Sequence, residues 1–83
     1  MTGEIRYKSS VSRDLKQIEP TDRERILGQI REVLGTDPHG GEPLRGEFEG
    51  LYKLRVGDYR VVYALVGGDV LVLRIRHRGS AYG

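Results

Sequence analysis

The 83-residue chain carries 14 basic and 12 acidic side chains, a net charge of +2 and no cysteine. This length suits a single core, so we expect residues 1–83 to form one domain, and the lack of cysteine excludes disulfides and thiolate metal sites. The sequence contains neither the ~20 consecutive apolar residues of a membrane-spanning helix nor a secretory leader, so we expect a cytoplasmic protein with no membrane partner.

The start of the chain predicts a short strand followed by a helix. Apolar and charged side chains first alternate, which is typical of a strand with one buried face. Val11, Leu15 and Ile18 then recur at helical spacing. Ser9 or Ser10 is the expected N-cap of this helix, because a serine hydroxyl accepts a hydrogen bond from the first turn.

A second helix is predicted after Pro20, because the residue before a proline avoids helical backbone angles. Thr21 and Glu24 have the spacing of a capping box, and Gly35 is expected to end the helix. Its apolar stripe contains Ile26, Leu27, Ile30, Val33 and Leu34. Two amphipathic helices in succession predict a helical hairpin that covers a sheet.

A loop is predicted over residues 36–43 from its glycine, proline and aspartate content. It contains His39, and the only other histidine of the chain is His77. Two histidines without further ligands at metal spacing do not predict a zinc site. We therefore expect neither a metal nor another cofactor.

From residue 44 onward, apolar side chains recur with the period of two that is typical of strands. Three strands are predicted, over residues 44–56, 59–66 and 69–77, separated by the tight-turn pairs Gly57-Asp58 and Gly67-Gly68. The element order β-α-α-β-β-β predicts an α+β fold, with an antiparallel sheet and the helical hairpin on one face.

The two halves of the sequence differ in charge. Residues 1–43 contain seven basic and eight acidic side chains, whereas residues 44–83 contain seven basic and four acidic ones. The basic excess therefore lies in the predicted sheet. It indicates an anionic partner, and nucleic acid is the commonest partner of this kind.

The first predicted hairpin carries three cations on one face. With Gly57-Asp58 as a two-residue loop, Arg55 lies directly opposite Arg60, and Lys53 shares their face because side chains alternate along a strand. Like charges that face each other across two strands are destabilising. The opposite face is apolar and is expected to lie under the helices. It contains Tyr52, Leu54, Val56, Tyr59, Val61 and Tyr63.

Two explanations fit the facing arginines. Nearby carboxylates, such as those of Glu47, Glu49 and Asp58, neutralise them in the first. In the second, the guanidinium groups of Arg55 and Arg60 bind an anion, and the planar fork of donors in arginine suits phosphate. The sequence leaves both explanations open.

The C-terminal strand adds further cations and an aromatic ring. Paired through the second tight turn, it places Arg78 and Tyr82 within reach of the hairpin cations. Strict alternation puts Arg74 and Arg76 on the opposite face, where we expect them to pair with the helices. A basic surface with an aromatic ring at its edge suits single-stranded RNA.

Such a site is able to cleave RNA without a metal if the 2′-hydroxyl attacks its own phosphate. The protein must then align the backbone, stabilise the developing negative charge and transfer protons. The hairpin cations supply the charge, but arginine is a poor base because it stays protonated. Glu42, His77 and Tyr82 are the candidates for proton transfer.

The sequence LYKLRVGDYRVVY, the ending HR-x-x-x-Y and the element order together resemble the RelE branch of the RelE/ParE toxin superfamily. The resemblance extends over nearly the whole chain. It implies a microbial-ribonuclease-like fold and a toxin of a type II toxin–antitoxin pair. Such a toxin enters the ribosomal A site, cleaves mRNA without a metal and so inhibits translation, and its cognate antitoxin binds around the active site.

The resemblance also assigns roles to residues. It implies that Lys53 stabilises charge on the phosphate, that Arg60 binds the phosphate, and that Arg78 protonates the leaving group. Tyr82 matches a tyrosine that stacks on or orients the substrate base. Arg55 stands where the best-known members have a lysine proposed as the general base, so the identity of the base stays open.

Glu42 is a further candidate for the general base. In the sequence GGEPLRG it matches a glutamate that acts as the base in the related YoeB-like toxins. His77 and Arg78 are expected to bind RNA together with the hairpin cations. Two alternatives stay open: a ParE-like, non-enzymatic inhibitor of DNA gyrase, and a catalytically weak RNA-binding member in which Arg55 does not replace the lysine.

Overall fold

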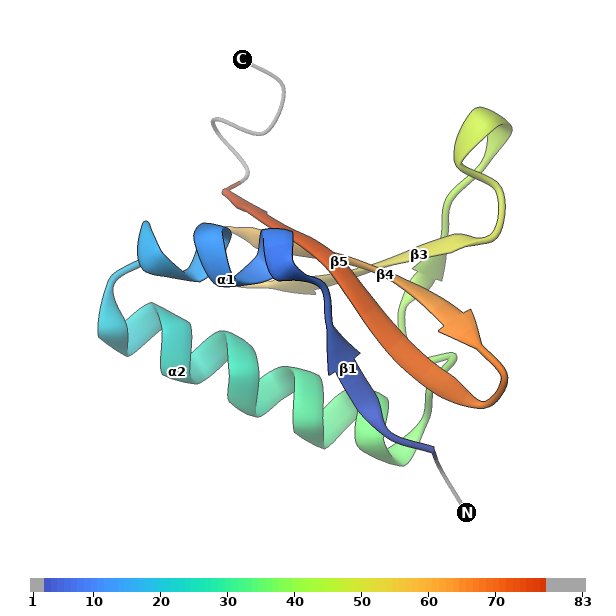
Figure 1. Ribbon diagram of the computed structural model, residues 1–83, viewed down its shortest axis with the longest axis horizontal. Helices are drawn as coiled ribbons and strands as arrows, with labels where there is room; N and C mark the ends of the chain where they lie inside the picture. Colours follow the sequence, from blue (N-terminus) through green and yellow to red (C-terminus); the bar gives the residue numbers. More distant parts are fainter. Residues whose placement is uncertain (1–2, 78–83) are drawn as a thin grey trace.

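The computed structural model describes residues 3–77, which form two helices and a five-stranded sheet (Figure 1). The α+β class predicted from the sequence is confirmed. Within residues 3–77, no helix is long and apolar enough to span a membrane. The elements are β1 (Ile5–Tyr7), α1 (Ser9–Lys16), α2 (Pro20–Gln29), the π-helical segment η1 (Ile30–Leu34), β2 (Glu42–Pro43), the 3-10 turn η2 (Gly46–Phe48), β3 (Leu51–Val56), β4 (Tyr59–Val66) and β5 (Asp69–His77).

The strands lie in the order β1-β5-β4-β3-β2. The pairs β3–β4 and β4–β5 are antiparallel, as predicted, and the β2–β3 pair is antiparallel as well. Strand β1, in contrast, is parallel to β5, with Ile5 opposite Val70. Parallel strands need a long connection rather than a tight turn. Here both helices and three strands lie between β1 and β5 in the chain, so β1 is free to join the outer edge of β5 in the parallel direction.

The predicted strand over residues 44–56 is divided in the structure. Only its second half forms a strand, β3, and its first half contains the 3-10 turn η2. The short strand β2 lies before residue 44, inside the predicted loop. Gly46 and Gly50 adopt φ angles of 70° and 95° at the two ends of this turn. Positive φ is incompatible with a strand and is accessible to glycine without a steric cost. These two glycines therefore interrupt the strand.

The helices begin and end at different residues from those predicted. Helix α1 has Lys8 rather than a serine at its N-cap, and α2 begins at Pro20 with Glu19 at its N-cap. Thr21 therefore lies inside the first turn instead of capping it, because the fixed φ of proline suits the first helical position. The helical backbone also continues through Gly35, whose φ is −70°.

The core lies between the helices and one face of the sheet. Arg23 of α2 fixes the angle between the helices, since its guanidinium donates hydrogen bonds to the carbonyl oxygens of Leu15 (3.1 Å) and Ile18 (3.0 Å). The Leu15 carbonyl lies in the last turn of α1 and that of Ile18 in the connection to α2, so Arg23 links the end of one helix to the start of the next. The buried apolar side chains are those of Val11, Ile18, Ile26, Ile30, Leu34, Val56, Val61, Tyr63, Val70, Val72 and Ile75.

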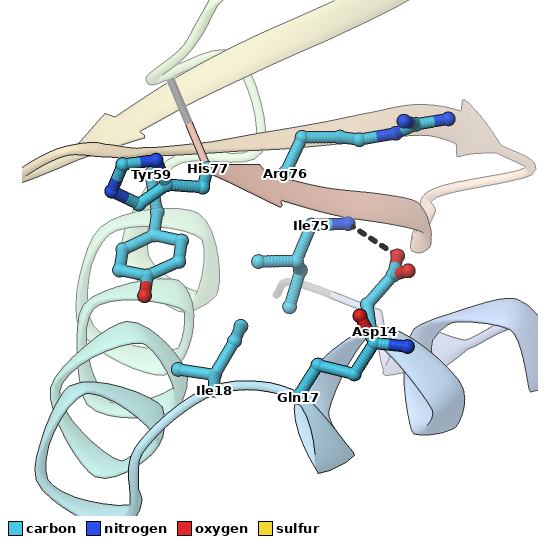
Figure 2. A pocket seen from close by; sticks show the side chains of 7 residues that line it. All are labelled: Asp14, Gln17, Ile18, Tyr59, Ile75, Arg76 and His77. Atoms are coloured by element: carbon cyan, nitrogen blue, oxygen red, sulfur yellow. Dashed lines mark hydrogen bonds between the residues drawn. The ribbon is translucent and has the colours of Figure 1, made fainter. Parts of the chain in front are cut away.

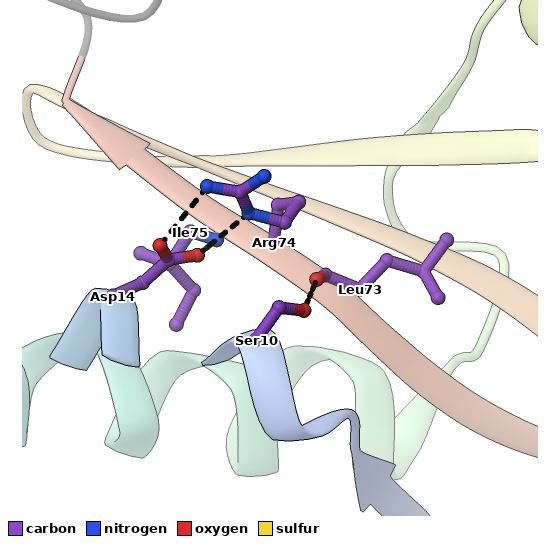
Figure 3. A network of polar contacts seen from close by, with 5 residues as sticks. All are labelled: Ser10, Asp14, Leu73, Arg74 and Ile75. Carbon is purple, nitrogen blue, oxygen red and sulfur yellow. Dashed lines mark hydrogen bonds and ion pairs between the residues drawn. The ribbon is translucent and has the colours of Figure 1, made fainter. Parts of the chain in front are cut away.

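Helix α1 covers the edge of β5 beyond the end of β1 (Figure 3). The Ser10 hydroxyl donates to the carbonyl oxygen of Leu73 (2.7 Å), and the amide of Ile75 donates to Oδ2 of Asp14 (2.9 Å). Asp14 also accepts two hydrogen bonds from the Arg74 guanidinium, at 3.0 and 3.2 Å. Side chains of one helix thus satisfy backbone groups that a neighbouring strand would otherwise pair.

A β-bulge in β5 changes the face on which its arginines lie. Next to the turn, Tyr63 pairs with Val72, but the register then shifts so that Val62 pairs with Arg74 and Arg60 with Arg76. The extra residue is Leu73. The sequence-based placement of Arg74 and Arg76 on the face opposite Arg60 is therefore wrong, because a shift of one residue moves every following side chain to the other face. The expected pairing with a helix is confirmed for Arg74, whose guanidinium bonds to Asp14 of α1.

Acidification is predicted to weaken the contact between α1 and β5. Burial opposes ionisation of Asp14, but its hydrogen bonds to Arg74 and to the Ile75 amide, with the nearby charge of Arg76, outweigh burial and lower its pKa. At acidic pH, the Asp14 carboxyl of the unfolded chain is therefore protonated to a greater extent than that of the folded protein. The free energy of unfolding therefore falls as the pH drops through the folded-state pKa of Asp14.

An Asp14→Asn variant tests this contact. We expect it to lose about 1–3 kcal/mol of stability at neutral pH, because hydrogen bonds to a charged group are lost. Denaturant unfolding between pH 3 and 7 is expected to show a shallower pH dependence for the variant than for the wild type. Asp22→Asn is the control, since the Asp22–Arg25 pair is exposed and contributes little. Parallel pH profiles for Asp14→Asn and the wild type would contradict the assignment.

Candidate nucleic-acid interface

The β3–β4 hairpin has the register predicted from its two-residue turn. Arg55 lies opposite Arg60, and Lys53 lies opposite Val62. The predicted apolar face is confirmed, since Val56, Val61 and Tyr63 are buried and the other members pack against them. The three cations therefore lie on the face of the sheet turned away from the core, which we call the outer face.

Cross-strand pairing arranges the outer face in two rows of side chains. Directly opposite residues have Cβ atoms about 4.5–5.5 Å apart, so members of one row are neighbours. One row contains Glu42, Lys53, Val62 and Arg74, and the next contains Arg55, Arg60 and Arg76. Because the bulge adds two arginines to this face, five cations are gathered there instead of the three predicted.

A pocket of about 200 Å³, which we call the cationic pocket, opens on the outer face between residues of β2, β3 and β4. It is lined by Glu42, Lys53, Arg55 and Arg60, so four of the predicted site residues come together. Lys53 and Arg60 are half-buried, whereas Glu42 and Arg55 are exposed. Three cations and one carboxylate around an open pocket form a surface suited to a phosphate group and to a proton acceptor beside it.

The explanation by neighbouring carboxylates does not hold for Arg55. Within residues 3–77, neither Lys53 nor Arg55 forms an ion pair with a carboxylate. Arg74, by contrast, is paired with Asp14 at the far end of its row. The positive charges of Lys53 and Arg55 are therefore available to an anionic partner.

The position of Glu42 depends on a buried tyrosine. The amide of Gly41 donates to the Tyr63 hydroxyl (2.9 Å), and this hydroxyl donates to the carbonyl oxygen of Pro38 (3.2 Å). Burial raises the pKa of Tyr63, so the hydroxyl keeps its proton. A Cβ atom on Gly41 would lie 2.5 Å from both the Tyr63 hydroxyl and the Lys53 carbonyl oxygen, so only glycine fits here.

A second pocket, of about 370 Å³, adjoins the first on the outer face. Arg60 lines both pockets. The other lining residues are Leu44, Phe48, Leu51, Val62, Leu73, Arg74 and Arg76. This pocket was not predicted, because residues 44–50 were expected to continue the strand instead of forming a turn. The two glycines that flank Glu47-Phe48-Glu49 were the signal for a projecting turn.

The structure separates His77 from the hairpin cations. Its ring packs edge-on against Tyr59, with centroids 5.1 Å apart and an interplanar angle of 82°. Figure 2 shows the His77 ring above that of Tyr59, at a pocket of about 470 Å³ that Asp14 and Ile18 also line. His77 thus lies on the core side of the sheet. Arg78 and Tyr82 lie outside the described residues.

The described residues favour anion binding over metal binding. Within residues 3–77, no three histidine, cysteine or carboxylate side chains lie close enough to hold one metal ion. Glu42 is the single carboxylate among the residues that line the cationic pocket. This set of side chains, three cations and one carboxylate, is suited to a phosphate group with a carboxylate beside it.

Comparison with known proteins identifies the family. The family model for the ParE toxin of type II toxin–antitoxin systems matches residues 5–82. The chain belongs to the RelE/ParE superfamily of type II toxins. Toxin RelE of Mycobacterium tuberculosis is 35% identical to this toxin in an alignment 81 positions long, which covers 94% of this chain and 84% of that protein.

Two further comparisons agree with this result. Toxin RelG of M. tuberculosis is 33% identical in a gapped alignment 85 positions long, which covers 94% of this chain and 93% of that protein. The toxin–antitoxin complex RelBE2 from the same organism contains a chain with a TM-score of 0.87 and 28% identity, over 94% of this chain and 100% of that one. The resemblance seen in the sequence is therefore confirmed for family and fold.

A Tyr63→Phe variant of this toxin tests how Glu42 is held. The variant removes the hydroxyl that bonds to Gly41 and Pro38, so we expect a loss of about 1–3 kcal/mol in the free energy of unfolding. Faster hydrogen exchange of the Gly41 amide is expected as well. Tyr52→Phe is the matched control, because its ring stacks on Tyr63 at 5.5 Å while its hydroxyl has no partner within residues 3–77. Equal effects of the two substitutions would contradict the role of the Tyr63 hydroxyl.

Proposed function

We propose that this toxin is an endoribonuclease that cleaves mRNA in the ribosomal A site and thereby inhibits translation. The observation that carries the proposal is the pocket in which Glu42 lies beside Lys53, Arg55 and Arg60. The names of the relatives support the RelE side of the superfamily. We further propose that a cognate antitoxin neutralises the toxin, as the solved complexes contain toxin and antitoxin together.

In the proposed reaction, the 2′-hydroxyl of one nucleotide attacks the adjacent phosphate. The phosphate binds to the three hairpin cations, which stabilise the negative charge that develops in the transition state. Glu42 accepts the proton of the 2′-hydroxyl, because Arg55 stays protonated and does not act as a base. The P–O5′ bond breaks, leaving a 2′,3′-cyclic phosphate and a 5′-oxygen that takes up a proton. Arg78 is the proposed donor of that proton, on the basis of the family resemblance.

Removal of a pocket cation is predicted to abolish toxicity. We expect Arg55→Ala to lower the rate of mRNA cleavage on programmed ribosomes about 10²–10³-fold, as for the loss of one group that stabilises transition-state charge. Wild-type cleavage is expected to yield 2′,3′-cyclic phosphate and 5′-hydroxyl ends, the products of attack by the 2′-hydroxyl. Arg13→Ala is the matched control, since it removes an exposed arginine from α1.

The result also separates the alternatives. Growth arrest with intact mRNA and gyrase-dependent DNA damage would favour the ParE-like function, for which the match to the ParE model is the supporting observation. Ribosome binding without cleavage would favour the catalytically weak RNA-binding member.

The Glu42→Gln variant distinguishes catalysis from binding. If Glu42 is the general base, we expect cleavage to fall about 10²–10⁴-fold. Affinity for a 2′-O-methyl RNA that cannot be cleaved is expected to stay equal or to rise, because a negative charge next to the phosphate is removed. Arg55→Ala, in comparison, is expected to lower both cleavage and affinity. Full activity of Glu42→Gln would exclude Glu42 as the base.

A further inference from the structure

The apolar pocket next to the cationic one has an unusual member. Phe48 is 53% exposed, and the other large apolar side chains exposed within residues 3–77 are Tyr7 and Val66. Of these three, only Phe48 lines one of the pockets described above. An exposed apolar side chain that is contiguous with an apolar groove, rather than isolated on the surface, is typical of a binding site.

The fold holds Phe48 in this position. The Leu44 amide donates to the carbonyl oxygen of Leu51 (2.8 Å), which closes the loop at its base. Gly46 and Gly50 supply the positive φ angles that turn the chain, and the amide of Glu49 donates to the carbonyl oxygen of Gly46 (3.1 Å). The resulting loop projects from the sheet (Figure 1). The ring is therefore presented by an ordered turn.

The charges around the pocket indicate what it binds. It is lined mainly by apolar side chains, together with those of Arg60, Arg74 and Arg76. Arg60 also lines the cationic pocket, so a group bound in one pocket lies next to a group bound in the other. A nucleotide combines these two requirements, because an anionic phosphate is attached to a flat base with two apolar faces.

We propose that the apolar pocket binds the nucleobase next to the phosphate held by Lys53, Arg55 and Arg60, and that this base stacks on Phe48. The inference rests on the proposed function, since it assumes that the cationic pocket binds an RNA phosphate. Stacking of bases on aromatic side chains accepts any base, so Phe48 contributes affinity and alignment.

The test uses a dinucleotide with a single phosphate, so that only its two bases are able to occupy the pocket. The probe is adenylyl-adenosine with a 2′-O-methyl group on its 5′ ribose, together with two forms that lack the 5′ or the 3′ base. NMR titration of the toxin gives each dissociation constant, and the amide signals of residues 44–51 report on the loop.

We expect removal of one of the two bases to weaken binding to the wild type. Phe48→Ala is expected to lower the affinity for the intact dinucleotide about 5- to 100-fold and to leave that for the matching abasic form unchanged. Phe48→Tyr is expected to bind like the wild type, and Phe48→Leu like Phe48→Ala, because only tyrosine keeps a ring. Val66→Ala is the matched control, since Val66 is 55% exposed and lines none of the described pockets.

Other outcomes would overturn the inference in distinguishable ways. If Phe48→Ala binds the intact dinucleotide normally while Arg55→Ala weakens all three probes, the phosphate site stands and the base subsite does not exist. If the wild type binds none of the probes but cleaves mRNA on ribosomes, the base subsite is overturned while the proposed function stands; if it also fails to cleave, both are overturned. If Phe48→Ala alters only the retention of a co-expressed antitoxin, the pocket binds a protein side chain instead.

Discussion

The bulge at Leu73 is the feature on which the functional face depends. Before it, the buried residues of β5 are Val70 and Val72, and after it the buried residue is Ile75. An unbroken alternation would expose Ile75 and direct Arg74 and Arg76 into the core, where unpaired charges are very costly. The extra residue avoids this cost and turns both arginines toward Arg60. The same shift thus completes the core and raises the number of cations on the outer face of β4 and β5 from one to three.

Helix α1 makes this bulge possible. A bulge leaves backbone groups without strand partners, and at this edge Ser10 and Asp14, one turn apart on α1, bond to the backbone of β5 on either side of Arg74. Asp14 also neutralises Arg74 at one end of the first row. Towards β2, the charges of Lys53 and Arg55 have no such partner within residues 3–77. The net positive charge of the outer face is therefore concentrated near β2, at the cationic pocket.

Much of this architecture follows from local sequence signals. Gly57-Asp58 fixes the register of the β3–β4 hairpin, and this register alone brings Lys53, Arg55 and Arg60 onto one face. The parallel pairing of β1 depends on contacts between distant segments, which local patterns do not encode. The bulge is present in the sequence as a break in the alternation of apolar residues, because Ile75 follows Val72 by three positions instead of two. Predicting it requires a comparison of two costs, exposing Ile75 and burying Arg74 and Arg76. The projecting loop at Phe48 likewise depends on the positive φ angles of Gly46 and Gly50, and the presence of a glycine alone does not predict a positive φ.

The single carboxylate of the cationic pocket makes one side of the pocket chemically different from the other. Glu42 stands at the β2 end of its row, opposite Lys53, so in the proposed mechanism the proton acceptor lies on the β2 side of the phosphate. Glu42 itself is exposed on a strand of two residues, which cannot hold a side chain rigidly by strand pairing alone. The hydroxyl of Tyr63 supplies the missing constraint from inside the core, through Gly41. In the proposed mechanism, the position of the base is therefore set by the packing of the core, and the phosphate position by the register of the hairpin.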